Sequence, residues 1–176
     1  MDVSRFWALI DEARELAEGS DATERAASQA EHLTQLLKQR SAAEIETFER
    51  RFHELMNQSY RWDLWGAAYV IHGGCSDDAF DYFRAWLIGQ GREVFERALK
   101  EPESLLELAR QEPDPTSVEL EAEPLMYAAA DAYIARTAED LDVPLPQRPD
   151  EPRGKAWEEN ELPKLFPKLW AHFEGA

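Results

Sequence analysis

Cysteine is almost missing from this sequence of 176 residues, in which Cys75 is the only one. A single thiol permits no internal disulfide, so the chain suits a reducing cytoplasm. Long apolar runs are missing too, because no stretch approaches the ~20 apolar residues that span a bilayer. The N-terminus is acidic and amphipathic, without the basic region and apolar core of a signal peptide. These absences predict a soluble cytoplasmic protein.

Positive charge is also scarce. There are 19 Lys and Arg residues against 36 Asp and Glu residues, which gives a formal net charge of −17 at pH 7. Nucleic acids and anionic membranes bind positive surfaces, so we expect direct binding to neither. The charge is compatible with a basic protein partner, with cations, or with nothing beyond solubility. It does not indicate an oligomeric state.

The sequence lacks the patterns of a β-fold and of several common enzyme sites. It has no strand-like alternation of useful length and no internal repeat of about 20–50 residues. The G-x-G-x-x-G, Walker A, G-x-S-x-G and H-E-x-x-H motifs are absent. Hydrophobic residues make up 44% of the chain and 19 residues are aromatic, which is enough for a substantial core. We therefore predict a single-domain, all-α multi-helix bundle.

The bundle is expected to form around an aromatic-rich helix pair at residues 62–91, WDLWGAAYVIHGGCSDDAFDYFRAWLIGQG. Gly73-Gly74 ends the first helix, because glycine adopts the left-handed C-cap conformation without a Cβ penalty. Ser76 is the expected N-cap of the second helix. Gly66 lies inside the first helix and costs roughly 1 kcal/mol relative to alanine. We therefore expect a close helix contact at Gly66.

Helices are also expected before and after this pair. Apolar residues at i, i+3 and i+4 spacing predict a helix over residues 4–18. The segments 21–24 (DATE) and 41–44 (SAAE) have the form of capping boxes, which begin two further helices. Residues 112–123, EPDPTSVELEAE, are typical of an acidic, proline-marked loop, which we expect to be mobile.

The C-terminal part of the chain has a different composition. Residues 141–154 are rich in proline and predict an extended crossing over the surface. Residues 155–176 combine many apolar side chains with prolines that limit them to short helical turns. We expect this C-terminal segment to dock on the body of the protein, whose motif-bearing core covers about residues 4–135.

Residues 62–91 also carry a long and specific pattern, W-D-L-W-G-A-A-Y-V-I-x-G-G-C-S-D-D-x-F-x-Y-F-R-x-W-L-I-x-x-G. Together with the preceding helix and residues 101–105, this pattern resembles a bacterial family, mainly actinobacterial, that is catalogued as a domain of unknown function. The resemblance covers about residues 4–135. It implies no established activity, cofactor or catalytic residue, so none is carried over to this chain.

Arg84 is the only fixed positive charge within residues 62–91. It lies at the edge of the aromatic face, where its guanidinium could anchor a carboxylate or phosphate in an aromatic-walled pocket. The alternative is an internal ion pair with Asp63, Asp77 or Asp81, because buried arginines usually have protein partners. Sealing of Arg84 by one of these carboxylates would count against the ligand-binding interpretation.

The turn between the two helices brings His72, Cys75, Asp77 and Asp78 close in sequence. A zinc site needs about four converging ligands with paired spacings, and this cluster offers one Cys and one His, so we predict no metal. A Cys75 nucleophile would gain from the adjacent helix N-terminus, with His72 as its base and Asp77 orienting the imidazole. The alternative is a small buried cysteine, with both aspartates acting as helix-capping charges.

Two functional hypotheses follow. The leading one is a non-catalytic binding or regulatory module whose acidic surface, contiguous in space, meets a basic partner. The alternative is a small-ligand binder or an enzyme with a pocket around the turn at residues 73–78, which the C-terminal segment covers. Whether the protein is an enzyme is left open, and no cofactor is indicated. The candidate ligand-binding residues are Arg84, His72, Tyr69, Cys75, Asp77, Asp78, Asp81, Trp65 and Trp86.

Overall fold

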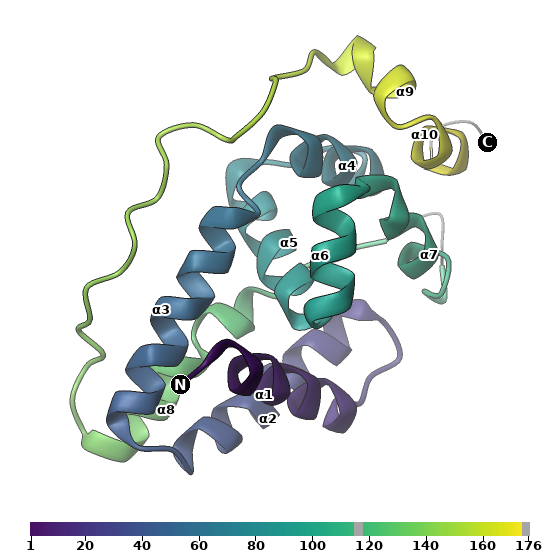
Figure 1. Ribbon diagram of the computed structural model, residues 1–176. Coiled ribbons are helices and arrows are strands. Elements are labelled where there is room, and N and C mark those ends of the chain that lie inside the picture. The colour runs from purple at the N-terminus through teal and green to yellow at the C-terminus, as the bar shows by residue number, and fades with distance from the viewer. Residues whose placement is uncertain (115–117, 174–176) are drawn as a thin grey trace.

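Helices make up the regular structure of the computed structural model, which describes residues 1–114 and 118–173 (Figure 1). Within these residues there is no strand, and the one isolated β-bridge joins Arg61 to Arg153. The prediction of an all-α multi-helix fold is confirmed. None of the described helices has both the length and the apolar composition needed to cross a membrane.

The first three helices begin at side-chain caps, of which the sequence predicted those at Asp21 and Ser41 but not Asp2 at the start of α1. Ser41 and Glu44 form a complete capping box, in which each side chain accepts from the other residue's backbone N–H. The box expected at Asp21 is only half formed. Asp21 accepts from the Glu24 N–H at 2.9 Å, but the Glu24 carboxylate accepts from the N–H and hydroxyl of Ser20 instead. The helices are α1 (Val3–Leu16), α2 (Ala22–Lys38) and α3 (Ala42–Gln58).

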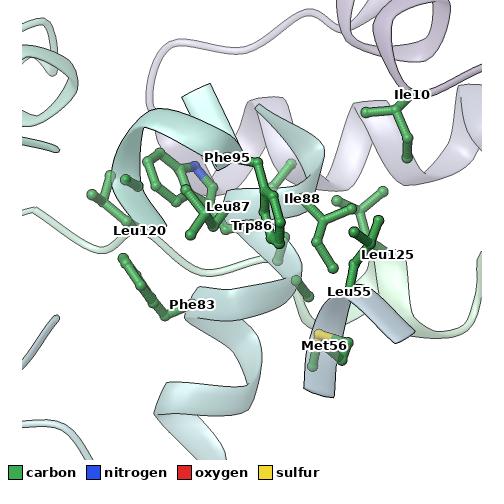
Figure 2. Close-up of a cluster of buried hydrophobic side chains, with 14 of the residues drawn as sticks. Ile10, Leu55, Met56, Phe83, Trp86, Leu87, Ile88, Phe95, Leu120 and Leu125 are labelled. Atoms are coloured by element: carbon green, nitrogen blue, oxygen red, sulfur yellow. The ribbon is translucent and has the colours of Figure 1, made fainter. Parts of the chain in front are cut away.

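The central pair consists of α4 (Trp62–His72) and α5 (Asp77–Gly89). Gly73 has φ of +65° at the end of α4, and the Ser76 hydroxyl accepts from the Ala79 N–H at the start of α5. Both caps are as predicted. Figure 1 places α5 in the middle of the molecule, and Figure 2 shows its Trp86, Leu87 and Ile88 within the cluster of buried side chains.

Shorter helices follow the central pair: α6 (Arg92–Lys100), the 3-10 turn η1 (Pro102–Leu105), α7 (Leu106–Ala109), the 3-10 turn η2 (Glu123–Met126) and α8 (Ala128–Thr137). The segment 118–122 before η2 is anchored, because Val118, Leu120 and Ala122 are buried and the intervening glutamates are not. The expectation of a mobile loop is wrong for this segment. Residues 115–117 of the same loop lie outside the described residues.

The proline-rich crossing, residues 141–154, runs from the end of α8 along the outer side of α3 toward the C-terminal helices (Figure 1). Its end is fixed by two backbone hydrogen bonds. Arg153 donates its N–H to the Tyr60 carbonyl, and the Trp62 N–H donates to the Arg153 carbonyl, both at 2.9 Å. The extended conformation therefore ends on the residues that begin α4.

The C-terminal segment contains η3 (Glu159–Glu161), α9 (Leu162–Leu165) and α10 (Pro167–Phe173), and α10 packs against α4. Leu162, Phe166 and Leu169 are buried. Gly66 is the place of the closest approach, because a Cβ there would lie 2.6 Å from Cε2 of Phe166. The close contact expected at Gly66 thus comes from the C-terminal segment, of which residues 174–176 lie outside the described residues.

Candidate functional site

Arg84 is 1% exposed and has protein partners on several sides. Its Nη2 donates to the Asp81 carboxylate one turn earlier on α5, and its Nη1 donates to the Met56 carbonyl near the end of α3. The rings of Tyr60 and Phe80 lie 4.9 and 5.0 Å from its Cζ. The guanidinium is therefore sealed by Asp81 and lies over two neighbouring aromatic rings, which is the ion-pair alternative. Its geometry gives the anion-anchor interpretation no support.

A second arginine completes this arrangement from a distant part of the chain. Arg148 of the proline-rich crossing donates to the other oxygen of the Asp81 carboxylate at 3.0 Å. Its Cζ lies 4.4 Å from the centroid of the Tyr60 ring. Asp81 thus joins α5 to the crossing, while Arg84 joins α5 to α3. Sequence reasoning missed Arg148, because no local pattern pairs it with a residue 67 positions earlier.

His72 holds the segment 118–122 against the end of α4. Its side chain is 7% exposed, and its Nε2 accepts from the Leu120 N–H at 3.1 Å. Its Nδ1 lies 3.9 Å from the Glu121 carboxylate. Burial lowers the pKa of His72 to about 4, so the imidazole is neutral at pH 7. A neutral Nε2 that already accepts a hydrogen bond is poorly placed to act as a general base.

Replacing His72 with glutamine is expected to weaken the acid sensitivity of folding. Between about pH 6.5 and about pH 4 the unfolded chain binds a proton at His72 that the folded chain does not, so stability falls as pH falls. In the wild type, His72 is expected to lower the free energy of unfolding by about 2 kcal/mol when the pH falls from neutral to about pH 5. Glutamine keeps an acceptor for the Leu120 N–H and does not titrate.

Urea unfolding of both proteins at the two pH values measures this contribution. The His72→Gln protein should lose less stability on acidification than the wild type. An equal loss in the two proteins would show that His72 is not buried as a neutral ring.

Cys75 lies in the turn with its thiol half-buried. Burial raises the pKa of Cys75 to about 12, and the carboxylates of Glu121 and Asp77 add to the increase. Burial and the two carboxylates therefore outweigh the lowering of the Cys75 pKa that was expected from the helix N-terminus. The thiol is protonated at neutral pH. The neighbouring Trp65 stacks on Phe80 and donates its Nε1–H to the Cys75 carbonyl at 3.0 Å. These contacts stabilise the turn and do not activate a nucleophile.

The C-terminal segment contacts Tyr69 through Trp157. Trp157 lies edge-on to Tyr69, with the ring centroids 5.3 Å apart, and donates its Nε1–H to the Trp62 carbonyl at 2.7 Å. Arg84 contacts the proline-rich crossing through Asp81, and His72 contacts the segment 118–122. The structure thus places three different segments over residues that were expected to line one pocket. Trp86 is separate again and lines a cavity at the other end of α5.

Carboxylates from the first turn of α5 and from the segment before η2 gather around Tyr82 and Cys75. The Glu123 carboxylate is the main cause of a raised pKa at Tyr82, and Asp78 and Glu121 add to it. Glu121 and Asp77 act on Cys75 in the same way. We call these residues the acidic patch: Asp77, Asp78, Glu119, Glu121 and Glu123.

The acidic patch has no cationic partner in the part of the chain that the structure describes. Its carboxylates form no ion pair there with Lys or Arg, and the imidazole near Glu121 is neutral at pH 7. Burial raises the pKa of Glu121, and the neighbouring Glu119 and Glu123 raise it further. No group of three or more His, Cys, Asp or Glu side chains among the described residues is placed to hold a metal ion.

Comparison with known proteins establishes the family. No curated protein and no solved structure matches the chain. The model of a family described as "Protein of unknown function (DUF4240)" matches residues 1–135, which include the central helix pair and the acidic patch. The expected relation to a domain-of-unknown-function family is confirmed, while the W-D-L-W pattern and the actinobacterial distribution stay predictions. The chain belongs to the DUF4240 family of proteins of unknown function.

Proposed function

We propose that this protein is a non-catalytic binding module whose acidic patch receives a Lys- or Arg-rich segment of a protein partner. The observation that carries the proposal is the gathering of five carboxylates, from two segments about 40 residues apart, with no Lys or Arg ion pair among the described residues. Like charges held together destabilise the compact state. A basic partner would offset this repulsion on binding.

Glu121 shows why the patch suits a cation. It is only half exposed, and both burial and the neighbouring carboxylates raise its pKa. A partner's ammonium or guanidinium would replace the lost hydration with a charge-assisted hydrogen bond. Such complementarity contributes to the association rate and to the choice of partner.

Carboxylates elsewhere on the surface are often paired within the chain. Glu54 pairs with Arg51 one turn earlier on α3, and Glu96 pairs with Arg92 on α6. The acidic patch differs from these two glutamates because none of its carboxylates pairs with Lys or Arg among the described residues. This difference supports a role beyond solubility.

A catalytic role at the turn has no comparable support. Arg84 has protein partners, the pKa of Cys75 is raised, and His72 already accepts a hydrogen bond. The excess of negative charge supports the further proposal that nucleic acids and anionic membranes are not direct partners. The further proposal of a cytoplasmic location rests on the single cysteine, which permits no internal disulfide and suits a reducing compartment.

Neutralising the patch is expected to weaken binding of a basic peptide. The test variant is Glu119→Gln/Glu121→Gln/Glu123→Gln, titrated with a synthetic decalysine peptide by calorimetry. Loss of three exposed charge pairs should weaken binding by about tenfold. The difference should shrink as salt is added, because salt screens exposed charges.

The matched control is Glu12→Gln/Glu15→Gln/Glu18→Gln, which removes the same charge from exposed positions at α1 and just after it. This control should bind the peptide nearly as well as the wild type. Equal weakening in the two triple variants would mean that only net charge matters, and the proposal would then fail.

A further inference from the structure

A polar cavity of about 280 Å³ lies between α1, α2, the end of α5 and α7, away from the residues of the acidic patch. The aromatic part of its wall is Trp86, and Ala26 and Leu108 add aliphatic surface. The polar part of the wall includes Arg14, Arg25, Gln29, Gln90 and Glu112. The wall thus combines charges of both signs with an indole ring, in a space suited to a small molecule.

Two deeply buried side chains in this wall have polar groups without partners. Trp86 is 4% exposed, and its indole Nε1–H donates to no described residue. Gln29 is 3% exposed and donates its amide N–H groups to the carbonyls of Ile10 (3.3 Å) and Gly89 (2.8 Å). Its Oε1 accepts from no described residue. Neither atom is fully buried, so both stay accessible at the wall of the cavity, where a bound molecule would pair with them.

The charges around the cavity are balanced. Arg14 pairs with Asp11 at 3.0 Å and donates to the Gln90 carbonyl at 2.6 Å. Arg25 pairs with one carboxylate oxygen of Glu112, whose other oxygen is buried and has no partner among the described residues. Each guanidinium is therefore paired with a carboxylate, although Asp11 lies outside the wall of the cavity. Because the charges within these two pairs cancel, the cavity favours a zwitterion over a simple anion.

We propose that this cavity binds a small zwitterion with the carboxylate and ammonium groups of a free amino acid. Its carboxylate would accept from the Trp86 Nε1–H and from the Arg25 guanidinium. Its ammonium group would donate to Gln29 Oε1 and to the Glu112 carboxylate. The side chain of the ligand would pack on the indole ring. This proposal does not depend on the acidic patch or on a basic partner.

The test follows the indole N–H resonance of Trp86 by ¹H–¹⁵N NMR in the full chain, with Trp86→Phe used to assign it. Each of the twenty common amino acids is titrated separately at constant ionic strength. At least one should cause a saturable shift of this resonance. Its deaminated and decarboxylated analogues should bind at least about tenfold more weakly, because each lacks one charged group. No shift with any amino acid, or equal affinity for the deaminated analogue, would overturn the proposal.

Arg25→Gln tests the wall without altering the core, because the Arg25 side chain is 40% exposed. It should weaken binding of the best amino acid by about tenfold. The matched control is Arg51→Gln on α3, which removes the same charge from another arginine paired with a glutamate, outside the wall of the cavity. The control should bind as the wild type does. Equal weakening in the two variants would show a general effect of charge and would also overturn the proposal.

Discussion

Replacing Arg84 with alanine is expected to lower the free energy of unfolding by about 3–5 kcal/mol. The guanidinium is 1% exposed and bridges Asp81 to the Met56 carbonyl. Its removal leaves the Met56 carbonyl without this donor and opens a cavity beside the rings of Tyr60 and Phe80. Urea denaturation followed by circular dichroism measures the change.

The control for this prediction is Arg92→Ala on α6. Arg92 also pairs with a carboxylate on its own helix, Glu96, but both side chains are about half exposed. Exposed pairs contribute little, so the control should change stability by less than about 1 kcal/mol. If Arg84→Ala lowered the free energy of unfolding no more than the control does, the buried contacts of Arg84 would not stabilise the fold as predicted.

Replacing Phe166 with alanine is expected to destabilise the protein by about 3–5 kcal/mol. Phe166 is 5% exposed and fills the space beside Gly66 on α4. Loss of the Phe166 ring leaves a cavity between α4 and the C-terminal segment. Leu162 and Leu169 of that segment then pack less tightly against the core. Leu165→Ala is the matched control, since Leu165 lies next to it in the same segment but is 51% exposed. The control should be nearly neutral.

The same pair of positions predicts that Gly66→Ala is less destabilising when Phe166 is removed. With Phe166 present, the new Cβ would lie 2.6 Å from Cε2 of that ring, and overpacking should destabilise by about 1–2 kcal/mol. In the Phe166→Ala protein the ring is gone and the remaining tight contact is with Nε1 of Trp157 at 3.0 Å, so Gly66→Ala should cost about 1 kcal/mol less than it does in the wild type. A double-mutant cycle measured by urea unfolding gives the coupling. Additive effects would contradict the close contact.

Some of the structure was predictable because its causes are local. Ser41, Gly73 and Ser76 cap helices through groups within a few residues of themselves, so the sequence nearby contains the whole interaction. The half-formed box at Asp21 shows the limit of this reasoning. There the Glu24 side chain has two backbone donors within reach, and it accepts from Ser20 instead of Asp21.

The segment 118–122 was not predicted, although its signal is visible in the sequence. Val118, Leu120 and Ala122 alternate with glutamates, and this period of two marks an extended segment with one buried face. The prolines before it indicated a loop and obscured the alternation. Its buried side also depends on His72, 48 positions away, which accepts from the Leu120 N–H.

The sequence by itself determined the all-α fold, the central helix pair and the excess of negative charge. These follow from periodicity, caps and composition, which are properties of neighbouring residues or of the whole chain. Only the tertiary structure decided that Arg84 is sealed, that Trp86 lines a separate cavity, and that the acidic patch lacks cationic partners among the described residues. The physical reason is that the burial and pairing of a polar group depend on segments far apart in the chain, such as Arg148 and Asp81.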